Sequence, residues 1–216
     1  MPTVYGVTLS LYTRKLRAFL AEKGIAYQLE FVAPGDPSPE YRRISPLGKV
    51  PAYRDGDVAL ADSSIICAYV ERMHPEPALY PSEPYTYARA LWFEEYGDSG
   101  LAAATGPIVF NTLIAPRFLG QPTDSNAVEK GTAALPSLFD YLESELEDGY
   151  LLGDFFTIGD IAIVSNFVHL RHVGIVADHQ RWPRLARYVE RISSRPSFQA
   201  LFEEELAMLG HRSDKA

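Results

Sequence analysis

Ser10 is the first residue in this sequence whose type and place suggest chemistry. It lies between a β-favouring run over residues 3–7 and a helical pattern over 13–23. On its own, a Ser at this position indicates a helix cap. Its hydroxyl could also donate to a thiolate, because a helix N-terminus lowers the usual thiol pKa of about 8.5. Such a hydrogen bond contributes ~1.5–3 kcal/mol, which corresponds to about one to two pKa units.

Asp62 and Ser63 open a second helical pattern, over residues 62–73. Both residue types are favoured caps, and the free N–H groups and dipole of a helix N-terminus also bind anions. A ligand carboxylate beside the Ser63 hydroxyl and an ammonium group beside Asp62 would recognise the head group of an α-amino acid. The capping and binding roles can hold at once.

Lys49-Val50-Pro51 leads into a predicted hairpin, whose strands at 51–53 and 58–60 flank Asp55-Gly56. Three such residues alone indicate a turn into a strand. A cis proline at this point would turn the backbone of Val50 outward. The N–H and C=O of Val50 could then pair with an extended peptide, as an added edge strand.

The elements around these residues alternate in type. With a strand at 27–32 and a short helix at 39–44, the order is β-α-β-α-β-β-α. This order predicts a mixed sheet layered with helices. Four prolines between 74 and 84 exclude a helix there, so this stretch is predicted to be a linker.

Helical patterns follow the linker almost without exception. The first, over residues 85–118, should be kinked or interrupted at Gly106-Pro107 and Pro116. The others lie at residues 125–147, 157–172, 183–193 and 196–209. We therefore expect an α/β domain at 1–76, a linker at 77–84 and an all-α domain at 85–216.

Composition excludes several classes of protein. The chain has 216 residues, 47% of them hydrophobic, which suits a soluble globular protein. Its net charge of −8 argues against nucleic acid as a partner, because phosphates need clustered Lys and Arg. Cys67 is the sole cysteine, so no intramolecular disulfide forms, and it lies in an apolar helical pattern that predicts a core position. With no secretory signal and no apolar run of ~18 residues, we expect a cytoplasmic protein that does not bind membranes.

Two further motifs are interpreted as structural. Thr157 and Asp160 form a capping box, whose helix should be buried. His169 and His172 have a possible ligand spacing, but without a matching carboxylate or Cys pattern we expect no metal.

Taken together, the chain resembles the cytosolic glutathione S-transferase family over nearly its whole length. In the first half the resemblance rests on SLYTRKLR at 10–17, AEKGIAY at 21–27, SPLGKVPA at 45–52 and DSSII at 62–66. In the second half it rests on LLGD at 151–154, TIGD at 157–160 and RPSF at 195–198. The resemblance implies a thioredoxin-like domain followed by an all-α domain, usually as a homodimer.

The resemblance also implies roles for the residues introduced above. Ser10 matches the hydroxyl that activates the glutathione thiol in serine-type members such as the theta, tau and phi groups. Val50 matches the residue that pairs with the cysteinyl unit of glutathione, ahead of a cis proline matching Pro51. Asp62 and Ser63 match the pair that binds the γ-glutamyl end. Lys49 matches a residue that often reaches the glycyl carboxylate.

The chain departs from the family pattern at two places. Leu11 stands where many relatives have Pro, and Asp36 lies near the place where a His, Gln or Lys is common. Because Asp36 cannot pair with a carboxylate, the contacts to the glycyl end should differ. No Cys lies near Ser10, which disfavours members that reduce mixed disulfides. Tyr5 ranks below Ser10 as the activating residue, and Tyr12 and Thr13 are lesser candidates.

The resemblance implies a detoxifying enzyme that conjugates glutathione, as co-substrate, to a small hydrophobic electrophile. The electrophile pocket should be lined by residues of the Ser10 loop and of the long helix after the linker: Leu11, Tyr12, Tyr96, Thr105 and Phe110. One alternative is a non-catalytic interaction or regulatory module that keeps the fold. Another is a glutathione-dependent isomerase, dehalogenase or peroxidase.

Overall fold

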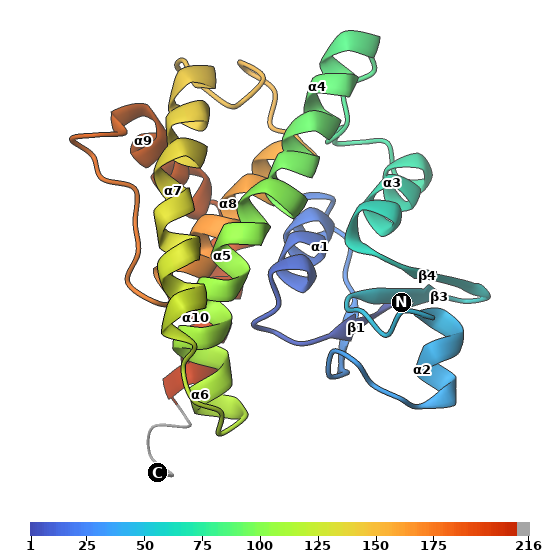
Figure 1. The fold of residues 1–216 in the computed structure, drawn as a ribbon. Helices are drawn as coiled ribbons and strands as arrows, with labels where there is room; N and C mark the ends of the chain where they lie inside the picture. Colours follow the sequence, from blue (N-terminus) through green and yellow to red (C-terminus); the bar gives the residue numbers. More distant parts are fainter. Residues whose placement is uncertain (211–216) are drawn as a thin grey trace. The chain divides into compact units, whose positions relative to one another are not determined.

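The computed structural model describes residues 1–210 and divides the chain into two units (Figure 1). The first unit contains residues 1–79 and takes up the chain again at residue 195, with the last helix. The second unit contains residues 80–194. Each unit contains only one class of architecture, α/β in the first and all-α in the second.

A four-stranded mixed sheet forms the centre of the first unit, in the order β2-β1-β3-β4. The strands are β1 (Thr3–Gly6), β2 (Gln28–Phe31), β3 (Ala52–Asp55) and β4 (Val58–Ala61). β1 runs parallel to β2 and antiparallel to β3, and β3 forms the predicted hairpin with β4. Gly56 in the hairpin turn has a φ of 58°, which a glycine adopts without steric cost. The predicted mixed sheet is confirmed.

Three helices cover the sheet. α1 (Leu11–Glu22) and α3 (Ser63–Met73) contact each other on one face, and α2 (Pro39–Ile44) lies on the other (Figure 1). Ser10 caps α1, and Gly24, just beyond its end, has a φ of 66°, as a C′ glycine should. The α1 helix is nearly enclosed, since its residues 13–20 are all buried.

The second unit is helical, as predicted. Its elements are α4 (Pro84–Glu95), η1 (Tyr96–Leu101), α5 (Ala102–Val109), η2 (Phe110–Ile114), α6 (Ala115–Phe118), α7 (Ser125–Glu145), α8 (Ile158–Arg171) and α9 (Pro183–Ser193). η1 and η2 are π-helical, so the long helix changes its hydrogen bonding at residues 96–101 and 110–114. Pro107 itself lies inside α5, so the second change begins three residues after the proline rather than at the predicted Gly106-Pro107 position. Pro107 lacks an N–H, which removes one helical hydrogen bond before that change.

α8 is the buried helix of the second unit, and its predicted capping box is present. The Asp160 carboxylate accepts hydrogen bonds from the N–H groups of Leu151 and Thr157, the Thr157 hydroxyl and the Tyr188 hydroxyl. Complete burial raises the pKa of Asp160, although each of these donors acts in the opposite direction. The box connects α8 to the loop before it and to α9, so it organises the core and touches no candidate site residue.

α10 (Pro196–Gly210) belongs to the first unit, whereas the sequence pattern placed it with the helical domain. Its first turn is tied to the end of α1, since the Glu22 carboxylate accepts hydrogen bonds from Arg195 and from the Ser197 hydroxyl. Glu204 and Glu205, two turns later, pair with arginines of α1. These contacts between residues far apart in the sequence accompany the grouping of α10 with the first unit, which helical periodicity alone does not indicate.

Candidate functional site

The register of the sheet brings the predicted binding segments to one end of the first unit. Tyr5, next to the last residue of β1, pairs with Ala52 at the start of β3, and Ala52 pairs with Ala61 at the end of β4. The segments that follow β1, precede β3 and follow β4 therefore leave the sheet at the same end of its strands. Those segments contain Ser10, Val50-Pro51 and Asp62-Ser63, respectively.

Ser10 is the N-cap of α1 and is partly exposed. Its Oγ accepts a hydrogen bond from the N–H of Thr13 at 3.3 Å, and its own N–H donates to the carbonyl of Val7 at 3.0 Å. The hydroxyl proton of Ser10 has no acceptor among residues 1–210. Ser10 can therefore cap the helix and still donate to an anionic ligand at the helix N-terminus.

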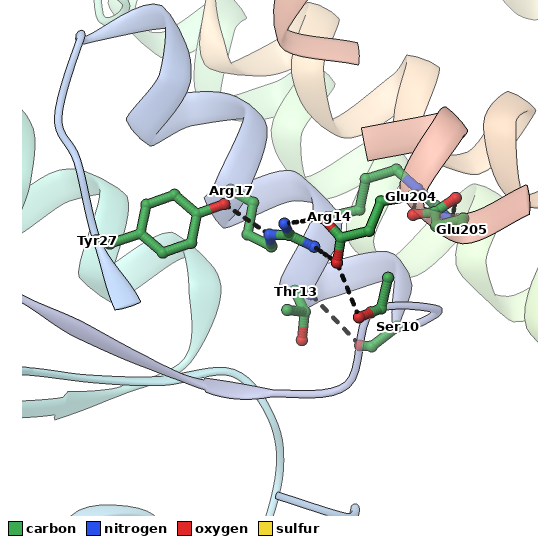
Figure 2. Close-up of polar contacts among 8 residues, drawn as sticks. Ser10, Thr13, Arg14, Arg17, Tyr27, Glu204 and Glu205 are labelled. Atoms are coloured by element: carbon green, nitrogen blue, oxygen red, sulfur yellow. Dashed lines mark hydrogen bonds and ion pairs between the residues drawn. The ribbon is translucent and has the colours of Figure 1, made fainter. Parts of the chain in front are cut away.

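Charged side chains of α10 fix the helix behind Ser10. Figure 2 shows Arg17 of α1 between Tyr27 and Glu204, and Arg14 against Glu205. The Arg14–Glu205 pair is bidentate, at 2.7 and 2.8 Å, and both side chains are completely buried. Burial alone would lower the pKa of Arg17, but hydrogen bonds to Glu204 and Tyr27 reverse this and raise it.

Glu204 also reaches the loop that carries Ser10. The hydroxyl of Thr8 donates to Glu204 Oε1 at 3.2 Å, and Arg17 donates to both oxygens of the same carboxylate. One carboxylate of α10 thus joins the β1–α1 loop to the second turn of α1. These contacts were not expected from the sequence, since nothing in the local pattern pairs residues nearly 200 positions apart.

The Val50–Pro51 peptide bond is cis, as predicted. The N–H and C=O of Val50 make no hydrogen bond with any other residue of the described chain. By contrast, the carbonyl of Pro51 accepts from the N–H of Asp62 at 3.3 Å, which joins two of the predicted binding segments directly.

Asp62 is the N-cap of α3 and has a φ of 81°, the one positive value outside glycine among the described residues. Its Oδ1 accepts hydrogen bonds from the N–H groups of Ser64 and Ile65, at 2.9 and 3.3 Å. Oδ2 has no partner in the described residues and lies on an exposed side chain. A non-glycine residue in this conformation is a feature of functional sites. Asp62 can hold the helix with one oxygen and a ligand ammonium group with the other.

Ser63 and Ser64 follow at the start of α3. Ser63 is 3% exposed, and its hydroxyl has no partner among residues 1–210. The Ser64 hydroxyl accepts from the ammonium group of Lys15 at 2.8 Å, and the Lys15 side chain is wholly buried in α1. Lys15 was not among the residues predicted from the sequence, where its one signal is a charged residue within the apolar face of a helical pattern.

Lys49 is exposed, and its ammonium group has no partner in the described part of the chain. Asp36 faces its own loop, where its carboxylate accepts from the N–H of Ser38 at 2.8 Å. Hydrogen bonding by Ser38 lowers the pKa of Asp36. Arg42 binds this loop to the next, because it donates to the carbonyls of Gly35, Asp36 and Pro46. Asp36 therefore orders a loop in this structure.

The residues predicted to line an electrophile pocket fall in both units. In the first unit Leu11 is buried and Tyr12 is partly exposed. In the second, Phe110 is 43% exposed, and Tyr96 packs its ring at a tilt against Tyr141 and donates to the carbonyl of Leu138. Burial and then the neighbouring Tyr141 raise the pKa of Tyr96 to about 12. Their role in binding an electrophile stays a prediction.

Thr105 differs from the other predicted pocket residues. It is wholly buried, and its hydroxyl donates to Asn166 Oδ1 of α8 at 2.7 Å. We therefore leave Thr105 out of the proposed pocket. A hollow of about 450 Å³ in the second unit, between α5 and α7, is lined mainly by small residues and contains none of the predicted pocket residues.

Two of the lesser candidates for thiol activation, Tyr5 and Thr13, pack against other residues of the first unit. Tyr5 packs its ring against Tyr41 at 6.2 Å, beside the sheet. Thr13 is wholly buried under Gly6, where a methyl group would come within 2.5 Å of its hydroxyl oxygen. No cluster of three metal-ligating side chains occurs in residues 1–210, and none of the helices described there is long and apolar enough to cross a membrane.

Comparison with known proteins agrees with this arrangement. The model of the glutathione S-transferase N-terminal domain matches residues 4–78, and that of the C-terminal domain matches residues 101–196. A probable glutathione S-transferase of Oryza sativa subsp. japonica is 30% identical over 200 residues, covering 91% of this chain and 93% of that protein. Glutathione S-transferase theta-3 of Mus musculus is 27% identical, covering 91% and 84%.

Solved structures give the same result. A glutathione S-transferase from Rhodospirillum rubrum F11 has a TM-score of 0.86 at 25% identity, covering 93% of this chain and 91% of that one. A glutathione S-transferase-I solved with the ligand lactoylglutathione has a TM-score of 0.84 at 28% identity, covering 94% and 98%. With the thioredoxin-like α/β unit and the all-α unit both matched, this chain belongs to the glutathione S-transferase family and is an enzyme of that family.

Proposed function

We propose that this enzyme joins glutathione to hydrophobic electrophiles and that Ser10 stabilises the reacting thiolate. The observation that carries the proposal is the set of unused hydrogen-bonding groups at one end of the sheet. These are the Ser10 hydroxyl proton, the N–H and C=O of Val50, Oδ2 of Asp62 and the Ser63 hydroxyl. In the strand order β1-β3-β4 they run from Ser10 through Val50 to Asp62 and Ser63, which suits the thiol, the peptide backbone and the γ-glutamyl end of glutathione.

Each group would contact one part of glutathione. The Val50 backbone would pair with the cysteinyl unit, as an added strand. Asp62 would hold the γ-glutamyl ammonium group, while Ser63 and the N-terminus of α3 would hold the α-carboxylate. Lys49, exposed and unpaired among the described residues, would approach the glycyl carboxylate.

The thiol would then lie beside Ser10. Its proton leaves to solvent, and the Ser10 hydroxyl donates to the sulfur anion at the N-terminus of α1. The sulfur lone pair forms a bond to an electrophilic carbon, while the electron pair of the broken bond leaves with the leaving group or moves to an acceptor. Binding supplies proximity between thiolate and electrophile. We propose that Leu11 and Tyr12, next to Ser10 in the chain, contact the electrophile, and Tyr96 and Phe110 of the second unit stay predictions from the sequence.

Relatives support glutathione as the co-substrate. The matching proteins from Oryza and Mus are named glutathione S-transferases, and one solved neighbour holds a glutathione derivative, lactoylglutathione. We propose, from the family, that the protein acts in the cytoplasm as a homodimer. Light scattering of the purified protein tests the dimer, and a mass of one chain would contradict it.

Ser10→Ala tests the role of Ser10, with Ser10→Thr as the matched control. Loss of one hydrogen bond to a thiolate should lower kcat roughly 10- to 150-fold. The thiol pKa of bound glutathione should rise by about one to two units, measured by thiolate absorbance against pH. Ser10→Thr keeps a hydroxyl and a helix cap, so its kcat and the thiol pKa of bound glutathione should stay near the wild-type values.

Other outcomes would change the activating residue or the proposed function. Full turnover in Ser10→Ala would transfer activation to Tyr5, Tyr12 or Thr13. Glutathione binding without turnover of any electrophile in a broad panel would favour the non-catalytic alternative. A wild-type protein that fails to bind glutathione in calorimetry would overturn the proposed function altogether.

A further inference from the structure

Two hydroxyl groups converge on one backbone carbonyl beside the proposed glutathione site. The Tyr41 hydroxyl donates to the carbonyl of Lys49 at 2.7 Å, and the Ser45 hydroxyl donates to the same oxygen at 2.8 Å. Tyr41 is 4% exposed and Ser45 is 1% exposed, so the Lys49 carbonyl points into the unit. A carbonyl oxygen has two lone pairs, and here both are used.

The direction of this carbonyl fixes the next N–H. The peptide bond between Lys49 and Val50 is not among the cis bonds of the described chain, so it is trans. In a trans peptide unit the C=O and N–H point in opposite directions. With the Lys49 carbonyl held inward, the N–H of Val50 must point away from the interior.

The segment is held in the same way on its other side. The carbonyl of Pro51 accepts from the N–H of Asp62, at 3.3 Å. Val50, which precedes a proline, is restricted to extended conformations, in which its own N–H and C=O lie on one side of the backbone. Val50 therefore sits between two fixed carbonyls and presents its N–H and C=O together on the opposite side.

The Tyr41 ring and the Ser45 backbone are fixed by contacts that do not involve these hydroxyls. Tyr41 and Ile44 of α2 form a core cluster with Ala52, against which Tyr5, Val50 and Ala61 also pack. The N–H of Ser45 donates to the carbonyl of Tyr41, and Gly48 donates back to the carbonyl of Ser45. The hydroxyls can therefore be removed without removing the packing that places them.

We propose that Tyr41 and Ser45 are positioning residues that aim the Val50 N–H at the peptide of glutathione. The inference rests on the proposed function, because it takes glutathione as the peptide that pairs with Val50. It adds two residues that touch no substrate atom and act through the Lys49–Val50 peptide unit. Their removal should weaken binding of the peptide while leaving the Ser10 chemistry intact.

The test compares Tyr41→Phe, Ser45→Ala and the double variant with wild type. Each single variant should weaken glutathione binding roughly 3- to 10-fold, the value of one hydrogen bond, and the double variant by more. KM for glutathione should rise while kcat stays near wild type, because binding is lost equally in ground and transition states. Calorimetry and steady-state kinetics measure both quantities.

A second readout reports on Val50 directly. In wild type, bound glutathione should slow hydrogen exchange of the Val50 amide, measured by NMR, and the double variant should lose most of this slowing at matched saturation. Tyr53→Phe is the control, since Tyr53 is also a buried tyrosine of this unit, and its hydroxyl has no hydrogen bond among residues 1–210. It should bind glutathione like wild type.

The possible failures are distinguishable. If wild type does not bind glutathione, the proposed function fails and this inference fails with it. If wild type binds and the double variant binds within about twofold of it, the inference alone is wrong. Should the double variant unfold, Tyr41→Phe keeps the ring and decides the outcome through the same amide exchange.

Discussion

The loop that ends at Ser10 and the segment around Val50 lie at the same end of the sheet, but different parts of the chain hold them. Behind Ser10, the arginines of α1 pair with carboxylates of α10, nearly 200 residues away in sequence. Around Val50, the backbone is fixed by hydroxyl and backbone groups that lie within 12 positions of Val50 in the sequence. The Ser10 side is fixed by ion pairs to residues distant in the sequence. The Val50 side is fixed by uncharged groups that are close in the sequence.

This difference decides how each side should respond to change. Removing one member of a buried ion pair leaves an unpaired charge, which is costly to the whole fold. Removing a neutral hydroxyl costs only a net hydrogen bond and acts mainly on the local backbone. We therefore expect variants of the ion pairs behind Ser10 to affect stability, and variants of the hydroxyl groups behind Val50 to affect affinity for glutathione.

Glu205→Ala should give the largest effect. It leaves the Arg14 guanidinium buried without its bidentate carboxylate. Breaking a buried pair in this way costs ~3–5 kcal/mol, measured as the free energy of unfolding in urea. The control is Arg14→Met with Glu205→Leu, which removes both charges and should recover most of the loss. A cost below about 1 kcal/mol for Glu205→Ala would contradict the idea that charge fixes this side.

Asp62→Asn should give an intermediate effect, on affinity rather than stability. Asn caps helices as well as Asp does, so stability should change by less than ~0.5 kcal/mol. The lost charge should weaken glutathione binding about 5- to 10-fold, since hydrogen bonds to charged groups are about twice as strong as neutral ones. Glutathione lacking its amino group should bind the variant and wild type alike. If calorimetry shows unchanged affinity for glutathione, Asp62 serves only as a cap.

The sequence predicted the Val50 side far better than the Ser10 side. The helix Pro39–Ile44, which carries Tyr41, matches the expected helix, because Pro39 and the capping residue Ser38 mark its start locally. The cis proline and the Asp62 cap were likewise visible as short motifs. Their partners lie close in sequence, so local patterns contain the information.

Other features depend on contacts that local patterns do not contain. The position of α10 depends on which distant arginines its glutamates pair with. The periodicity of a helical pattern contains no information about those partners. Thr105 has the polarity of a pocket residue, but its hydroxyl is used by Asn166 of another helix. The convergence of Tyr41 and Ser45 on one carbonyl depends on how the chain turns after α2, beyond what the spacing of their residue types predicts.

The smallest predicted effect concerns pH and uses Glu22, which ties α1 to the first turn of α10. Burial by itself would raise the pKa of Glu22, but hydrogen bonds from Arg195 and Ser197 and the Arg195 charge outweigh it and lower the pKa. A lowered pKa in the folded state means that the stabilisation is present above the unfolded value of 4.5 and is lost as pH falls through the folded value.

The measurement compares wild type with Glu22→Gln across that range. Because Arg195 is partly exposed, the difference in unfolding free energy at pH 7 should be at most ~1 kcal/mol, and it should shrink as pH falls below 4.5. The same scan with Tyr41→Phe is the comparison from the other side of the site. The two hydroxyl donors on that side, Tyr41 and Ser45, carry no charge at acid or neutral pH. The difference in unfolding free energy between Tyr41→Phe and wild type should therefore stay constant with pH. A Tyr41→Phe difference that also faded in acid would show that charge contributes to both sides.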